Sequence, residues 1–126
     1  MSYRTARARV TGLGAAHGGV HHWWTQRITS VALIPLTVLF VVPFAQVLGD
    51  GYEAVRALYS HPFHAIVAVL FLSVSFHHLA QGLQVVIEDY VHAKAWRTGL
   101  LIANSLFCAA LGVAGVFAVL KIAFTA

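Results

Sequence analysis

Three long apolar stretches dominate the chain. They cover residues 28–48, 62–87 and 98–120, and none of them contains Asp, Glu, Lys or Arg. Each is at least as long as the roughly 20 residues that an α-helix needs to cross about 30 Å of hydrocarbon. The apolar positions are continuous and do not alternate with a period of two, so they predict helices and exclude barrel strands. We therefore expect an all-α membrane protein with three transmembrane helices.

The three stretches fit one membrane-anchor domain over residues 1–126. We expect an N-terminal segment at 1–26 and helices at about 27–48, 61–89 and 97–122. The N-terminal segment lacks an apolar core followed by a small-residue cleavage site, so it does not resemble a cleaved secretory signal. Two prolines, Pro35 and Pro43, fall inside the first apolar stretch, where each removes an intrahelical hydrogen bond and favours a bend.

Composition and charge support the membrane reading. With 60% hydrophobic and 10% charged residues, the chain has too few charges to coat a soluble protein. Basic residues gather before the first apolar stretch and between the second and third, which predicts a cytoplasmic N-terminus and a C-terminus on the opposite side. The net charge of +4 carries no aromatic-basic pattern of the kind that binds nucleic acid. The orienting residues are Arg4, Arg7, Arg9, Arg27, Lys94 and Arg97.

Cysteine supplies neither a crosslink nor a metal site. Cys108 is the single cysteine and lies in the third apolar stretch, so an intrachain disulfide is impossible. No C-x-x-C-H sequence is present for covalent haem attachment. Any haem would therefore be held by coordination and packing, as in a b-type cytochrome.

The second apolar stretch contains ionisable side chains, which are costly within a membrane and usually mark a function. At about 100° per residue, His78, Gly82 and Asp89 share one helical face. The pattern admits two interpretations: His78 binds a haem iron beside a flat surface left by Gly82, or both residues serve only helix packing. His64 lies about 21 Å from His78 along a helix, so a second histidine ligand would have to come from another chain. A polar stripe adjoins this face and consists of His77, Gln81, Gln84 and Glu88.

Two further groups have candidate chemistry at the membrane surface. Tyr90 and Asp89 end the second helix about 16 Å from His78. The Tyr90 phenol could donate to a quinone carbonyl, with Asp89 orienting donors or relaying protons, or the pair could be an interfacial anchor and a solvated acid. Arg27, which follows Trp23 and Trp24, could pair with a haem propionate or with a lipid phosphate.

The arrangement resembles the small hydrophobic membrane anchor, or cytochrome b small subunit, of succinate dehydrogenase, over nearly the whole chain. His78, Gly82, Asp89 and Tyr90 reproduce in order the family pattern H-x-x-x-G-x-x-x-x-x-x-D-Y. The resemblance implies that His78 is one axial ligand of haem b and that a larger cytochrome b subunit supplies the other. It also implies ubiquinone contact at Tyr90 with support from Asp89. Arg27 would then lie near a haem propionate and His21 in the same cytoplasmic-side neighbourhood of the haem, while His77 has no counterpart in the pattern.

On this resemblance the chain anchors a succinate:quinone oxidoreductase and contributes to quinone reduction, without a site for succinate oxidation. The implied partners are the cytochrome b large subunit, an iron-sulfur subunit, a flavoprotein subunit and the lipid membrane. The expected location is the bacterial cytoplasmic membrane, with the mitochondrial inner membrane as the alternative. Two other functions stay open: a quinol:fumarate reductase anchor, and a redox-silent structural membrane protein whose histidines only pack.

Overall fold

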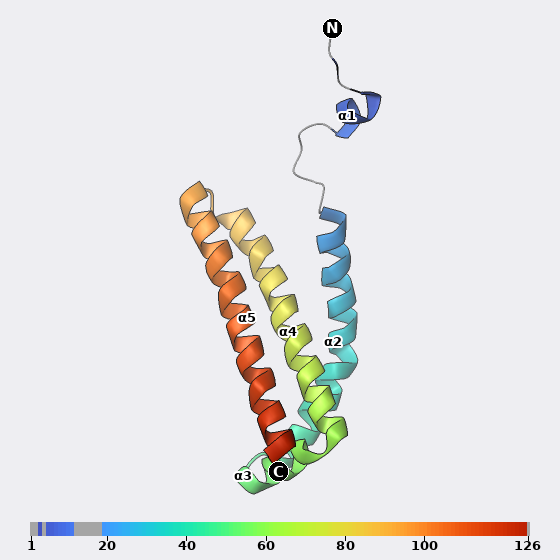
Figure 1. The fold of residues 1–126 in the computed structure, drawn as a ribbon, viewed down its shortest axis with the longest axis vertical. Coiled ribbons are helices and arrows are strands. Elements are labelled where there is room, and N and C mark those ends of the chain that lie inside the picture. Colours follow the sequence, from blue (N-terminus) through green and yellow to red (C-terminus); the bar gives the residue numbers. More distant parts are fainter. Residues whose placement is uncertain (1–2, 4, 12–18, 126) are drawn as a thin grey trace.

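The chain forms a bundle of long helices (Figure 1). The computed structural model describes residues 3, 5–11 and 19–125. In order, the helices are α1 (Ala6–Thr11), α2 (Gly19–Val47), α3 (Tyr52–Ser60), α4 (Pro62–Tyr90) and α5 (Lys94–Thr125). The described residues contain no strand, and three of their helices, α2, α4 and α5, are long and apolar enough to cross a membrane. The prediction of an all-α protein with three transmembrane helices is confirmed.

The helices extend beyond the apolar stretches that revealed them. Helix α2 begins at Gly19, eight residues before the predicted start, and α5 begins at Lys94. A criterion based on apolar runs detects only the part of a helix within hydrocarbon, whereas the hydrogen-bonded backbone continues into the head-group layer. Residues 12–18, which belong to the predicted N-terminal segment, lie outside the described residues.

Helix α4 is the centre of the bundle. It contacts both α2 and α5, whereas α2 and α5 do not contact each other. Helices α4 and α5 run side by side, and α2 leans away from α4 toward its own N-terminal end (Figure 1). The start of α2, the end of α4 and the start of α5 lie at one end of the bundle. Helix α3 and the C-terminus lie at the other end.

The most tightly packed region lies at the α3 end. Ala68 is completely buried there, and Tyr59 and Val119 are nearly so. The Phe40 ring stacks on Phe71 at a centroid distance of 4.4 Å and on Tyr59 at 6.2 Å. Burial raises the pKa of Tyr59 above its ordinary value because it penalises the phenolate. Most other large apolar side chains face outward, as expected for surfaces that meet lipid or another subunit.

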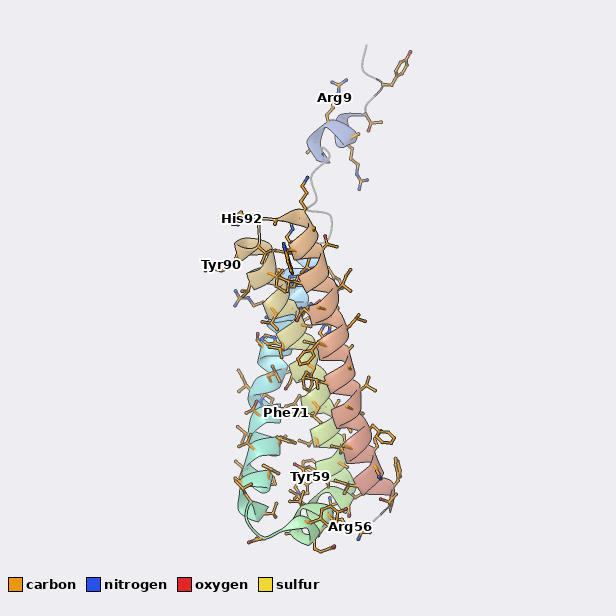
Figure 2. All side chains as sticks on the ribbon, turned by 90° about the vertical axis from the view of Figure 1, so that its left-hand side faces the viewer. Arg9, Arg56, Tyr59, Phe71, Tyr90 and His92 are labelled. Atoms are coloured by element: carbon orange, nitrogen blue, oxygen red, sulfur yellow. The ribbon has the colours of Figure 1, made fainter. Side chains whose placement is uncertain are left out.

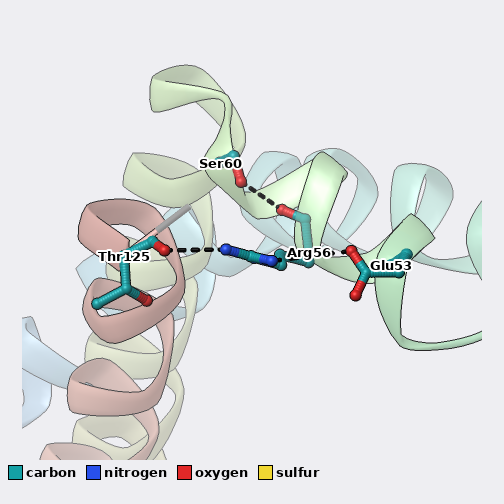
Figure 3. Close-up of polar contacts among 4 residues, drawn as sticks. All are labelled: Glu53, Arg56, Ser60 and Thr125. Atoms are coloured by element: carbon teal, nitrogen blue, oxygen red, sulfur yellow. Dashed lines mark hydrogen bonds and ion pairs between the residues drawn. The ribbon is translucent and has the colours of Figure 1, made fainter.

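Helix α3 was not predicted from the sequence. Its apolar residues Val55, Leu58 and Tyr59 follow a helical spacing and pack against the core. The Arg56 guanidinium donates to the carbonyl oxygen of Thr125 at 2.9 Å and lies 3.8 Å from the Glu53 carboxylate (Figure 3). Because the last carbonyls of a helix lack intrahelical partners, Arg56 satisfies one of them and ties α3 to the end of α5.

Glycines allow α4 and α5 to approach closely. A Cβ at Gly115 would lie 3.2 Å from Leu72 Cδ1. We expect Gly115→Leu to lower the thermal unfolding midpoint in mild detergent, measured by circular dichroism, because overpacking typically costs about 1–3 kcal/mol. Gly99→Leu is the matched control, since nothing lies within 4 Å of a Cβ at Gly99. Equal midpoints for the two variants would contradict this packing.

Candidate functional site

The imidazole of His78 faces α2. Its Nδ1 lies 2.9 Å from Thr29 Oγ1, and its Nε2 lies 3.4 Å from the side-chain nitrogen of Gln26. The Thr29 hydroxyl is within donating distance of the Thr25 carbonyl oxygen, at 2.8 Å. With its one proton used there, the hydroxyl accepts a hydrogen bond from Nδ1–H. In that tautomer the Nε2 lone pair is available, and its nearest polar neighbour is the Gln26 amide.

Little side-chain volume separates α4 from α2 beside His78. A Cβ built at Gly82 would meet only the Gln26 side-chain nitrogen, at 3.7 Å. Two polar atoms of α2, Gln26 Oε1 and His22 Nε2, are buried without a hydrogen-bond partner among the described residues. Buried polar atoms are normally paired, so these two atoms indicate a place where a further polar group belongs. The site thus combines an available imidazole nitrogen, a missing side chain and unpaired polar atoms.

The sequence analysis missed three of these residues. His22, Gln26 and Thr29 lie at positions i, i+4 and i+7 of α2, which places them on one face. That spacing was readable from the sequence, but only the packing of α2 against α4 shows that the face meets His78.

The remaining predicted residues make no hydrogen bond to His78. His21 and Arg27 are exposed on α2, and neither hydrogen-bonds to His78. The Arg27 guanidinium carbon lies 5.4 Å from the centroid of the Trp23 ring, a cation–π arrangement. Asp89 is exposed, and Tyr90 is 79% exposed at the last position of α4. Figure 2 places Tyr90 at the opposite end of the bundle from Tyr59 and Arg56.

The site holds two imidazoles, that of His78 on α4 and that of His22 on α2, whose Nε2 is buried without a partner among the described residues. No cluster of three or more His, Cys, Asp or Glu side chains that could hold a metal ion occurs among the described residues. The first turns of α2 and the last turn of α4 lie at the same end of the bundle. His21 and Arg27 are exposed on the first, and Asp89 and Tyr90 on the second.

Comparison with known families decides the kind of protein. The family described as succinate dehydrogenase/fumarate reductase transmembrane subunit matches residues 1–119. This chain belongs to that family. As a member, it is a membrane anchor subunit of an oxidoreductase complex, and it works in association with the membrane and with other subunits.

Individual relatives of this anchor subunit agree. It is 34% identical over 121 residues to a succinate dehydrogenase hydrophobic membrane anchor subunit of Paracoccus denitrificans, covering 96% of this chain and 93% of the relative. A protein of the same description in Rickettsia bellii is 32% identical over 108 residues, covering 83% of this chain and 84% of the relative. A succinate dehydrogenase membrane anchor subunit of Reclinomonas americana is 28% identical, with 63% and 68% covered. No solved structure gives a significant match.

Proposed function

We propose that this anchor subunit contributes one axial ligand, His78, to a haem b shared with a larger cytochrome b subunit, and forms part of a ubiquinone site at Tyr90 and Asp89. The complex would also contain an iron-sulfur subunit and a flavoprotein subunit, which carry succinate oxidation. The observation that carries the proposal is the intramembrane imidazole of His78, oriented through Nδ1 by Thr29 and facing the space beside Gly82.

The residues at this site fit a haem. A hydrogen bond at one imidazole nitrogen fixes the ring and leaves the other nitrogen for a metal, as second-shell partners of ligating histidines commonly do. Displacing the 3.4 Å contact between His78 Nε2 and the Gln26 amide would cost little, because it is at the long limit of a hydrogen bond. Gly82 leaves room for a flat macrocycle near the α4 backbone. When bound, a haem b supplies a site for one-electron storage.

The chain's own residues have distinct tasks in this proposal. His78 would bind the haem iron, Thr29 would orient the His78 imidazole, and Gly82 would leave space for the macrocycle. Arg27 and His21 lie at the end of the bundle where haem propionates would meet the head groups. The Arg27 guanidinium would leave its contact with Trp23 to form a charge-assisted hydrogen bond with a propionate. The unpaired atoms of Gln26 and His22 support a polar ligand group between α2 and α4.

The quinone site is proposed at the exposed end of α4. The Tyr90 phenol donates a hydrogen bond to a quinone carbonyl oxygen, which gains negative charge as it is reduced. Asp89 is exposed beside it and can hold or pass on the protons that reduction consumes. The exposure of Asp89 and Tyr90 in the single chain supports this role. A quinone site shared with other subunits requires that the end of α4 is not covered by this chain's own residues.

The matching family includes both succinate dehydrogenase and fumarate reductase subunits. The relatives named above are all described as succinate dehydrogenase anchors, which favours quinone reduction as the physiological direction. Relatives from Paracoccus and Rickettsia favour a bacterial cytoplasmic membrane. The N-terminus would lie on the cytoplasmic side, where the basic residues gather.

Removing the Thr29 hydroxyl tests its orienting role. We expect Thr29→Val to lower the haem affinity of the purified complex about 10–100-fold and to shift its reduced-minus-oxidised spectrum, since loss of a second-shell partner has effects of this size. Thr25→Val is the matched control, because the Thr25 hydroxyl donates to the His21 carbonyl and makes no hydrogen bond to His78. A Thr29→Val complex with unchanged haem affinity and spectrum would contradict the orienting role.

A further inference from the structure

A polar stripe runs along α4 outside the haem site. It consists of the stripe defined above, His77, Gln81, Gln84 and Glu88, extended by Ser73 one turn earlier, and the five positions recur at intervals of four, four, three and four residues. This spacing holds the side chains on one helical face, over a length of about 22 Å at 1.5 Å per residue. None of these residues takes part in the proposed haem or quinone chemistry. They lie on a transmembrane helix, where polar side chains are costly unless they are paired.

The stripe faces an open groove between α4 and α5. The groove has a volume of about 840 Å³, and Ser73, His77, Gln81 and Gln84 line its α4 side. On the α5 side, Ser105 and Ala109 are small and exposed and lie four residues apart on one helical face. Small residues at such positions allow another helix backbone to approach closely in a membrane. Bulky apolar side chains, including Phe117 and Leu120, line the groove toward the far end of α5.

The stripe is only partly satisfied within the chain. The Gln84 amide donates to the Glu88 carboxylate at 2.9 Å, whereas Gln81 Oε1 is buried with no partner among the described residues. His77 is exposed. A lipid acyl chain or an isoprenoid tail in the groove would leave the exposed Ser73 and His77 side chains facing hydrocarbon. A helix with hydrogen-bonding side chains would pair Ser73 and His77, and a basic residue at its end would complement the exposed Glu88.

We propose that the groove between α4 and α5 is the docking site for a transmembrane helix of another membrane subunit of the complex. That helix has Ser, Thr, Asn or Gln side chains at the depth of His77 and Gln81, and a Lys or Arg at the level of Glu88. The proposal rests on the proposed function only in placing the chain inside a multi-subunit membrane complex. It does not depend on haem ligation by His78 or on the quinone site.

Crosslinking within the purified complex identifies what occupies the groove between α4 and α5. Phe117 lines the groove and Phe107 does not, while both lie on α5 and their exposures are similar, at 67% and 63%. The photoreactive analogue p-benzoylphenylalanine is placed at one position or the other. Position 117 should give an adduct that mass spectrometry assigns to a transmembrane segment of a different subunit. Position 107 should not give that adduct.

Three results would overturn the proposal: an adduct of position 117 with lipid, an adduct with a second copy of this chain, or no protein adduct at that position. The same partner adduct from both positions would also overturn it, because the contact would then not be specific to the groove.

A substitution tests the polar stripe independently. We expect Gln81→Leu to speed loss of the partner subunit in detergent about three- to tenfold, because a hydrogen bond between membrane helices is of this modest strength. Gln81→Asn, which keeps an amide, should restore much of the retention. The haem spectrum of the intact complex is recorded alongside. A lost haem signal with full subunit retention would count against the docking role, whereas failure of His78→Ala to affect the haem would leave docking unaffected and refute only the ligand assignment.

Discussion

Replacing His78 with alanine should abolish the b-type haem signal of the purified complex or shift it strongly. The His78 imidazole has a nitrogen lone pair suited to iron and an orientation fixed by Thr29 at 2.9 Å. Alanine removes the ligand, and the two α2 side chains that contact His78, those of Gln26 and Thr29, offer only an amide and a hydroxyl. The measurement is a reduced-minus-oxidised absorption spectrum of the complex in mild detergent, normalised to protein content.

The neighbouring histidine provides the control. His77 is exposed and faces the groove between α4 and α5, about 100° around the helix from His78. His77→Ala should therefore keep the haem spectrum. Loss of haem in His77→Ala with retention in His78→Ala would show that the ligand is misassigned. A complex that carries no haem before any substitution would favour the structural alternative, in which the histidines only pack.

Replacing Tyr90 with phenylalanine should have the second-largest effect. We expect quinone reduction by the complex to fall about 10–100-fold, because the phenol would no longer donate to a carbonyl oxygen that gains charge during reduction. Oxidation of succinate coupled to a soluble artificial acceptor should stay unchanged, since it bypasses the quinone. The ring is 79% exposed in the single chain, so the substitution should not disturb the fold of this subunit.

Tyr52 is a suitable control for this measurement. It is 68% exposed at the start of α3, at the other end of the bundle. Tyr52→Phe should leave both activities unchanged. If the complex with Tyr90→Phe still reduced quinone at the full rate, the Tyr90 phenol would be only an interfacial anchor. A loss of both activities in that variant would instead indicate damage to assembly, which subunit retention on a gel would reveal.

Local patterns predicted more of the fold than of the site. Runs without charged residues identified α2, α4 and α5, because crossing hydrocarbon requires length and apolarity that few other structures share. The same criterion missed α3, a nine-residue amphipathic helix, because short helices depend on packing for their stability. It also placed the start of α2 too late, since Arg27 ends the run without charged residues but does not interrupt the helix.

The sequence by itself determined the membrane helices, the family pattern from His78 to Tyr90 and the polar stripe beside it, because each depends on spacing along one helix. Tertiary structure alone decided which faces meet. It placed Thr29 and Gln26 against His78, left His21 and Arg27 exposed, and opened a groove beside the stripe between α4 and α5. Helical periodicity fixes the direction in which a side chain points around the axis of its own helix. The rotation of one helix against another is set by packing between residues far apart in the chain, such as Phe40 with Phe71 and Gly115 with Leu72.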